Sequence, residues 1–275
     1  MAIITLTTDY GNKDYSVSSL KAKLISEIDD INIVDITHDI SPFNLAEAGY
    51  VLEGAFSEFP KGTIHILSVD SELTPENKHI AIMYDGSFFI GADNGVFSLI
   101  FRDKKPDQIV EINLHSNYNY DISADELFVK VASHINRLGP LNVVGTEMKT
   151  IKEITNLRPV INKEMNQILG SVIYIDNYGN VVTNITEKLF KEISKTRPFT
   201  INARNVKFSK IHKNYSDAID FNLEKKDREE DGKKIALFNN LGYLQLSVYR
   251  SNPQTVGSAS TLFGLNYRDA VSVYF

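Results

Sequence analysis

Residues 3–35 read IITLTTDYGNKDYSVSSLKAKLISEIDDINIVD, and this stretch decides the fold of the first half of the chain. Residues 3–8 are β-branched and apolar, which favours a buried strand. The apolar residues of 16–28 recur at the spacing of one helix face: Val17, Leu20, Leu24 and Ile28. A second strand-like run covers 31–35. A strand, a helix and a strand in this order predict an α/β layer with a mostly parallel sheet.

The same alternation continues to residue 140. Asn44 is a candidate cap for a helix over 45–56. Asp85-Gly86 lies between two apolar runs, which is the strongest short signal for a β-hairpin. The remaining predicted elements of this half are a strand over 63–69, hairpin strands over 80–84 and 87–90, and a helix over 124–137. We therefore predict an N-terminal α/β domain over residues 1–140.

The pattern changes after Gly139-Pro140. Residues 141–165 are predicted to form a connector, and short β segments follow from Gly170 onward. They cover 171–175, 181–185, 199–201, 235–239, 244–248 and 270–274. One short helical pattern interrupts them, at 187–193. This spacing predicts a smaller all-β C-terminal domain over 166–275, either a barrel or a sandwich.

Composition excludes several classes of protein. The 275 residues carry a formal net charge of −6, which argues against binding to a nucleic-acid backbone. The chain has no cysteine, and therefore no disulfide, thiolate zinc site or cysteine nucleophile. No run of eighteen apolar residues could span a membrane, and the N-terminus lacks the basic region of a signal peptide. We expect a cytoplasmic protein without nucleic-acid or membrane partners.

Acidic residues lie where an α/β sheet binds ligands, at the carboxyl ends of strands. Asp9, Asp35 and Asp70 each end a predicted strand, and Asp14 precedes the first helix. A structural interpretation makes Asp14 a helix cap and the others turn residues. Alternatively, a carboxylate here binds the vicinal hydroxyls of a ribose, because its two oxygens can each accept one hydrogen bond. Since no phosphate-binding glycine motif is present, a nucleoside ligand would lack a polyphosphate.

Other polar residues have simple structural interpretations. The six histidines form no pair at metal-ligand spacing, so we predict no metal site. Ser123 with Glu126 has the pattern of a helix capping box. Residues 176–180, Asp-Asn-Tyr-Gly-Asn, form a polar turn between two predicted strands. Residue types and spacing alone support no more than a small-molecule site.

Several motifs occur together in a fixed order: 7–11 (TTDYG) with Asp14, 34–38 (VDITH), 59–63 (FPKGT), 91–95 (GADNG), 175–180 (IDNYGN) and 257–259 (GSA). In this order they resemble the S-adenosylmethionine (SAM) hydroxide adenosyltransferases, which are related to the SAM-dependent fluorinase and chlorinase. The resemblance implies an N-terminal α/β domain, a C-terminal β-barrel, and a homotrimer with its sites at subunit interfaces. It also implies that SAM is a substrate, split with water into adenosine and L-methionine without a cofactor.

The resemblance also assigns binding roles. It implies that Asp9 holds the ribose hydroxyls and that Asp14 and Ser16 line the same pocket. Asp176 and Asn180 would contact the methionine portion, and Tyr178 takes the family's aromatic position. The remaining implied positions are Asn240 near the methionine carboxylate, and Ser258 and Ala259 near adenine.

The catalytic positions depart from the family pattern. The hydrolases orient water with an aspartate, an arginine and a histidine; Asp70 matches the aspartate, whereas the other two positions fall on Asn77 and Ser123. After Asp70, the segment 71–74 (SELT) replaces the usual Pro-Gly-Val-Gly. The main hypothesis is a SAM hydrolase with a remodelled water site. The alternatives are a SAM- or adenosine-binding protein without turnover, and a SAM-dependent halogenase.

Overall fold

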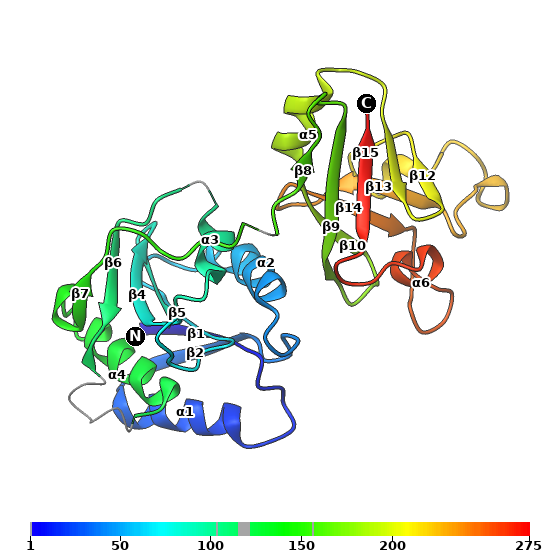
Figure 1. Ribbon diagram of the computed structural model, residues 1–275. Helices are drawn as coiled ribbons and strands as arrows, with labels where there is room; N and C mark the ends of the chain where they lie inside the picture. Colours follow the sequence, from blue (N-terminus) through cyan, green and yellow to red (C-terminus); the bar gives the residue numbers. More distant parts are fainter. Residues whose placement is uncertain (1, 103, 115–121, 156) are drawn as a thin grey trace. The chain divides into compact units, whose positions relative to one another are not determined.

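The computed structural model describes residues 2–275 except 103, 115–121 and 156 (Figure 1). The chain divides into two compact units, Met1–Ile154 and Thr155–Phe275. Part of the predicted connector is built into their sheets. Strand β7 (Gly145–Glu147) pairs with β6 (Gln108–Ile112), and β8 (Val160–Ile161) pairs with β9 (Gln167–Ile175).

The first unit is built on a seven-stranded sheet in the order β2-β1-β3-β5-β4-β6-β7. Strands β2 (Ile31–Thr37), β1 (Ala2–Thr8), β3 (Ile64–Ser68) and β5 (Ser87–Ala92) are parallel neighbours. The ladders from β5 through β4 (His79–Tyr84) to β6 and β7 are antiparallel. The sheet is therefore mixed, and the prediction of a mostly parallel sheet is not confirmed.

The predicted hairpin explains this difference. Asp85 and Gly86 both adopt left-handed backbone, with φ of 48° and 71°, and join β4 to β5 directly. A two-residue turn can connect only antiparallel strands, so it reverses the chain direction in the middle of the sheet. Because β6 and β7 also pair antiparallel beyond β4, only one half of the sheet is parallel.

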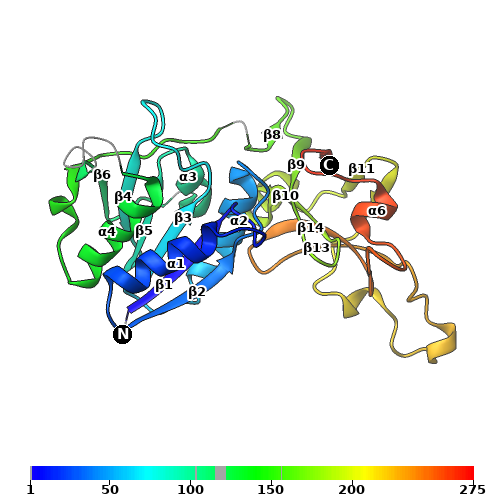
Figure 2. The ribbon, with the colours of Figure 1, turned by 90° about the horizontal axis from the view of Figure 1, so that it is seen from below.

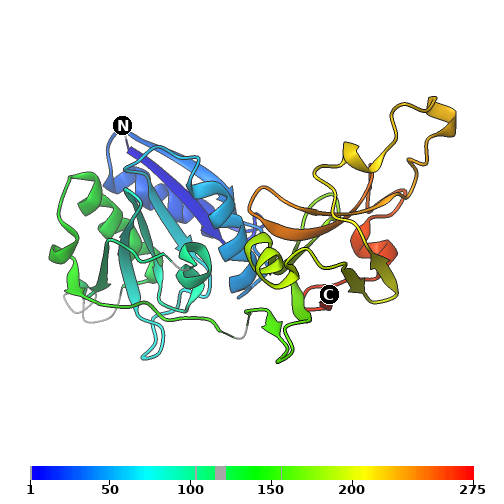
Figure 3. The same cartoon turned by 90° about the horizontal axis from the view of Figure 1, so that it is seen from above.

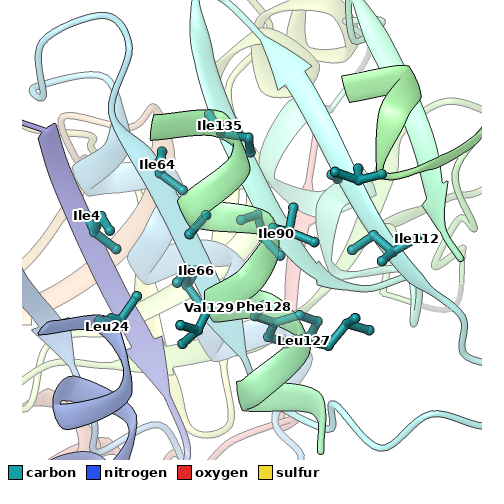
Figure 4. Packing of buried hydrophobic residues seen from close by; sticks show 14 of the residues in the cluster. Ile4, Leu24, Ile64, Ile66, Ile90, Ile112, Leu127, Phe128, Val129 and Ile135 are labelled. Carbon is teal, nitrogen blue, oxygen red and sulfur yellow. The ribbon is translucent and has the colours of Figure 1, made fainter. Parts of the chain in front are cut away.

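Helices cover both faces of this sheet. On one face, α1 (Ser16–Glu27) and α4 (Ala124–Asn136) pack through residues such as Leu24 and Phe128 onto Ile4, Ile66 and Ile90 (Figures 2 and 4). The other face carries α2 (Leu45–Phe56) and α3 (Val96–Phe101). Asn44 caps α2 as predicted. The six-residue α3 was not predicted, because it is too short to show helical periodicity.

The second unit is an antiparallel, nearly closed, barrel-like sheet of eight strands, as the prediction of a barrel or sandwich allows. Its main path is β12-β11-β15-β9-β10-β14-β13, with β8 added to β9. Just after β12, His212 bridges Leu237 of β13, which brings the two ends of the sheet together. The bounds are β10 (Val181–Thr186), β11 (Thr200–Ala203), β12 (Val206–Phe208), β13 (Lys234–Phe238), β14 (Tyr243–Val248) and β15 (Ala270–Tyr274).

Two helices accompany this sheet, α5 (Glu187–Ser194) at the predicted place and α6 (Ala259–Phe263), which was not predicted. The connection from β12 to β13 projects from the sheet (yellow to gold in Figure 3) and carries two 3₁₀ turns, Ser216–Ala218 and Lys225–Asp227. A third 3₁₀ turn, Leu141–Val143, belongs to the first unit. Within the described part of the chain, no helix has the length and apolar character needed to cross a bilayer.

Candidate active site

The carboxyl edge of the first sheet gathers the acidic residues that the sequence singles out. Since β1 and β3 are parallel and Thr8 pairs with Ser68, Asp9 and Asp70 leave the sheet close to one another, from adjacent strands. Asp35 does not end its strand as predicted: it lies within β2, two residues before the end, and pairs with Leu6 of β1. The carboxyl edge is the one at which α/β sheets bind their ligands.

Asp35 is already engaged by other side chains. Its carboxylate lies 2.5 Å from Lys21 Nζ and 3.1 Å from Nε2 of the buried His38. Burial by itself would raise the pKa of Asp35, but the hydrogen bonds from Lys21 and His38 outweigh it and lower that pKa. His38 in turn bonds Thr8 through Nδ1. Asp35 and His38 therefore hold β1 and β2 together.

Asp9 and Asp14 lie on the loop between β1 and α1. Asp9 is half-buried, and its Oδ2 accepts a hydrogen bond from the Phe43 amide at 3.0 Å. Asp14 is exposed, and its Oδ1 accepts from the amide of Ser16, the first residue of α1. That backbone hydrogen bond lowers the pKa of Asp14. Asp9 is oriented by the next loop along the edge, whereas Asp14 satisfies the start of its own helix.

Asp70 begins the loop between β3 and β4. It adopts left-handed backbone with φ of 47°, and its carbonyl accepts from the side chain of the buried Asn94 at 3.2 Å. At the far end of the loop, the Asn77 amide donates to Thr74 Oγ1, and Asn77 Oδ1 accepts from Lys152 Nζ at 3.1 Å. The loop that carries Asp70 is thus anchored at both ends.

Ser123 caps α4, as the structural interpretation predicts: its side chain accepts from the Glu126 amide. Two residues later, Asp125 accepts hydrogen bonds from Tyr10 and Ser68. Sequence reasoning missed these two contacts, because they join segments that lie far apart in the chain. Tyr10 stood in the quoted TTDYG motif, but nothing in that motif indicates a partner in α4.

In the second unit, the turn 176–180 is organised by its own aspartate. Asp176 Oδ1 accepts from the amides of Tyr178 and Asn180, at 2.9 and 2.8 Å, and Oδ2 accepts from Asn180 Nδ2. Asn180 is 5% exposed, and its buried Oδ1 has no partner among the described residues. Tyr178 is 65% exposed. The turn therefore presents an aromatic ring and one amide oxygen that is free to accept.

Ser258 and Ala259 lie against this turn. The carbonyl of Gly179 accepts from the Ser260 amide at 3.0 Å, and a Cβ added to Gly179 would come within 2.2 Å of Ser258 Oγ. Ser258 caps α6 through a capping box, and both Ser258 and Ala259 are fully buried. The 176–180 turn therefore packs against the N-terminus of α6.

Asn240 lies elsewhere in the second unit. It is exposed in the turn between β13 and β14. In the β10–β14 ladder, Val181 pairs with Leu246 and Thr186 with Tyr243. Asn240 therefore lies at the end of this ladder opposite to the 176–180 turn, so within the second unit the structure does not bring it to Asp176, Tyr178 and Asn180.

A pocket of about 430 Å³ lies beside the 176–180 turn, within the usual size range of small-molecule sites. Its lining comprises Tyr178, Asn180, Tyr215, Val248, Arg250, Ser251 and Asn252. Tyr215 was not among the predicted residues; its hydroxyl accepts from Gln245 at 2.6 Å. The described residues include no cluster of His, Asp and Glu side chains that could hold a metal ion.

Both units match family models. Residues 4–145 match the SAM hydroxide adenosyltransferase N-terminal domain, and residues 170–272 match the C-terminal domain of the same family. This chain belongs to the SAM hydroxide adenosyltransferase family. The chain is 28% identical to the (R)-S-adenosyl-L-methionine hydrolase of Methanocaldococcus jannaschii, and the alignment covers 99% of this chain and 96% of that protein. It is also 22% identical to the fluorinase of Actinopolyspora mzabensis, over 66% of this chain and 71% of that protein.

Solved structures share the fold of this SAM hydroxide adenosyltransferase. An uncharacterized conserved protein from Thermotoga maritima has a TM-score of 0.78 at 25% identity, with 99% of this chain and 100% of that chain covered. A conserved hypothetical protein from Thermus thermophilus has a TM-score of 0.70 at 19% identity, with the same coverage.

Two of the three predicted catalytic positions in this family member have structural partners. The Asn77 side chain accepts from Lys152, and Ser123 is used to cap α4. The Asp70 carboxyl group differs from these two side chains. The contacts that hold its loop are made by the backbone carbonyls of Val69 and Asp70, and they leave the carboxyl group to other uses. Asp70 is therefore the strongest candidate in this unit for direct contact with a reacting group.

Proposed function

We propose that this protein hydrolyses SAM to adenosine and L-methionine by attack of water on C5′ of the ribose. The observation that carries the proposal is the placement of Asp9 and Asp70 after neighbouring parallel strands. At this edge we assign Asp9 to the ribose hydroxyls and Asp70 to the attacking water. The relative from Methanocaldococcus jannaschii supports the reaction, because it is a named SAM hydrolase that aligns over nearly the whole chain.

The chemistry requires little from the protein. The sulfonium of SAM leaves as a neutral thioether, so no acid is needed for the leaving group. The acidic loops favour a cationic substrate. Asp9 accepts hydrogen bonds from the ribose hydroxyls, and Asp70 orients the attacking water and accepts its proton. Rate enhancement then comes mainly from holding water in line with C5′ and the sulfur.

We assign binding roles to the other predicted residues on the same basis. Asp14 and Ser16 line the ribose side. Because Asn240 lies at the end of the β10–β14 ladder opposite to Asp176 and Asn180, we do not assign it to their subsite. The pocket beside the 176–180 turn supports a methionine subsite at Asp176 and Asn180, with Tyr178 in the aromatic position. We assign Ser258 and Ala259, which pack against this turn, to the adenine side. No cofactor takes part in this reaction, and we place it in the cytoplasm.

Product analysis in heavy-oxygen water tests the reaction. Purified protein incubated with (R)-SAM should release equimolar adenosine and methionine, with heavy oxygen in the 5′-hydroxyl of adenosine. Asp70→Asn should lower kcat by about 10²-fold or more, the usual range for loss of a general base. Glu72→Gln, an exposed neighbour, is the matched control and should retain activity. Absence of adenosine above a protein-free blank would exclude the reaction, and equal turnover by the wild type and Asp70→Asn would exclude the role of Asp70.

We further propose a homotrimer whose sites combine the first unit of one subunit with the second unit of another. Sedimentation measures the oligomeric state. Two inactive variants, Asp70→Asn and Asn180→Ala, are then unfolded, mixed in equal amounts and refolded. Shared sites predict recovery of about a quarter of wild-type activity, since random assembly pairs two intact halves in that proportion of sites. Sites within single subunits predict no recovery.

SAM or adenosine binding without turnover is the second candidate function, and the engagement of Asn77 by Lys152 and of Ser123 in the cap favours it. Calorimetry showing micromolar SAM affinity together with no product would establish it. Because the chain is also similar to fluorinases, the assay should include halide ions as alternative nucleophiles. Fluoride, chloride or bromide should yield no 5′-halo-5′-deoxyadenosine if water is the nucleophile.

A further inference from the structure

A hydrogen-bond network of four side chains crosses the carboxyl edge of the first sheet. The Tyr10 hydroxyl donates to Asp125 Oδ1 at 2.5 Å and lies 2.6 Å from Ser68 Oγ. Ser68 Oγ is 3.2 Å from the same carboxylate oxygen and 2.9 Å from Ser71 Oγ. The network joins the end of β1, the end of β3 and the first turn of α4.

The members of this network are chain neighbours of the two key carboxylates. Tyr10 directly follows Asp9, and Ser68 and Ser71 stand on either side of Asp70 in the chain. The network therefore ties the segment that carries the ribose anchor to the segment that carries the water-orienting residue. Neither Asp9 nor Asp70 is itself a member of it.

The network is partly buried. Ser68 is fully buried, and Tyr10 is half-buried against the core under α4. Burial, and after it the nearby Asp125 carboxylate, raises the pKa of Tyr10, so the hydroxyl stays protonated as a donor throughout the neutral pH range. Ser71 is also held through its carbonyl, which lies 2.8 Å from Nε2 of the buried His79. Hydrogen bonds to a charged acceptor that is partly shielded from water are stronger than exposed bonds between neutral groups.

We propose that Tyr10 and Asp125 are positioning residues, which lock the Asp70 loop to β1 and so fix the attacking water relative to the ribose. This inference rests on the proposed hydrolysis of SAM. Its physical reason is the left-handed backbone of Asp70, which persists only where surrounding contacts determine it. A displacement of about 1 Å of a reacting group can cost 10²-fold in rate.

Tyr10→Phe removes the hydroxyl and keeps the packed ring. We expect kcat for SAM to fall at least about tenfold, with KM changed less than about threefold, because the variant misplaces water without removing a substrate contact. Tyr84→Phe is the matched control, a buried tyrosine in β4 beside the hairpin at the opposite edge of the sheet. It should retain the wild-type kcat.

Asp125 provides a rescue test. Asparagine keeps an oxygen that can accept from Tyr10 and Ser68, whereas leucine keeps only the volume. Asp125→Asn should therefore retain most of the wild-type kcat, and Asp125→Leu should resemble Tyr10→Phe. The double variant Tyr10→Phe/Asp125→Leu should lose no more than the worse single variant, because both act through one network.

Amide hydrogen exchange separates this inference from the proposed function. Tyr10→Phe should increase exchange at residues 69–77 and leave β4 and β5 protected, whether or not the protein turns over SAM. If the wild type makes no adenosine, the proposed hydrolysis is wrong, and the positioning role for catalysis is wrong with it. If the wild type is active but Tyr10→Phe matches Tyr84→Phe in kcat and in exchange at 69–77, the network has no positioning role.

Discussion

The side-chain amide of Asn94 holds the backbone of Asp70. Its Nδ2 donates to the carbonyl of Asp70 at 3.2 Å and to that of Val69 at 3.0 Å, from a side chain that is almost fully buried. A carboxylate that acts on water must keep its place while the backbone beneath it is in a sparsely populated conformation. Asn94 supplies that constraint through the backbone carbonyls of Val69 and Asp70, independently of the Tyr10 network.

Replacement of Asn94 tests this relationship. Asn94→Ala leaves two carbonyls without a donor, so we expect a loss of about 1–3 kcal/mol in the free energy of unfolding and a lower kcat. Urea denaturation and steady-state kinetics measure the two effects. Asn113→Ala is the control, because the Asn113 side chain bonds Thr146 at an exposed position and should cost about 0.5 kcal/mol or less. Equal effects of the two variants would contradict the anchoring role of Asn94.

Asp9 should discriminate ribose from deoxyribose. The wild type should bind adenosine more tightly than 2′-deoxyadenosine by about tenfold to a hundredfold, because a hydrogen bond to a charged acceptor contributes about 1.5–3 kcal/mol. Asp9→Ala should bind both nucleosides with similar, weak affinity. Calorimetry with the two ligands measures this difference. If Asp9→Ala keeps the preference for ribose, another residue holds the hydroxyls.

His65 should make stability depend on pH. It is fully buried among the rings of Phe56, Phe59 and Phe89, and burial lowers its pKa to about 4. In the unfolded state, the histidine has an ordinary pKa near 6.5. Between about pH 4 and pH 6.5 the unfolded state therefore binds more protons than the folded state, and stability rises with pH.

The expected size is roughly 3 kcal/mol of unfolding free energy lost between pH 6.5 and pH 4. Denaturant titrations at a series of pH values measure it. His65→Gln cannot titrate and should show a flatter profile over the same interval. Parallel profiles for the two proteins would show that other groups govern acid unfolding.

Gly179 should be intolerant of any side chain. Its φ is 73°, and a Cβ would lie 2.2 Å from Ser258 Oγ, so Gly179→Ala combines backbone strain with a clash against α6. Gly232→Ala is the control: φ there is 68°, and nothing lies within 4 Å of an added Cβ. We expect both variants to lose about 1 kcal/mol from strain, and Gly179→Ala to lose at least about 1–2 kcal/mol more.

Thermal unfolding measures this difference, and calorimetry with adenosine gives a second measurement. Because Tyr178 and Asn180 line the pocket on either side of Gly179, Gly179→Ala should also weaken ligand binding. Comparable stability and binding in the two variants would show that the turn does not depend on its packing against Ser258.

Elements with strong local signals were predictable from the sequence. The Asn44 cap, the Asp85-Gly86 hairpin and the Ser123 cap all appear in the structure, because each depends on residues within one turn of chain. The short helices α3 and α6 were missed, since five or six residues give too little periodicity. The prediction contained too much parallel pairing. Beyond the hairpin, the direction of each strand depends on the strand beside which it lies, and local sequence does not indicate that neighbour.

The sequence by itself determined the α/β first half, the β-rich second half, the family and the set of acidic residues at strand ends. These follow from local periodicity and from motif order, which the chain carries in consecutive residues. Only the tertiary structure decided that Tyr10 meets Asp125, that Asn94 holds Asp70, and that Asn240 lies away from Asn180. Such contacts depend on strand order and register, which bring together segments up to 115 positions apart.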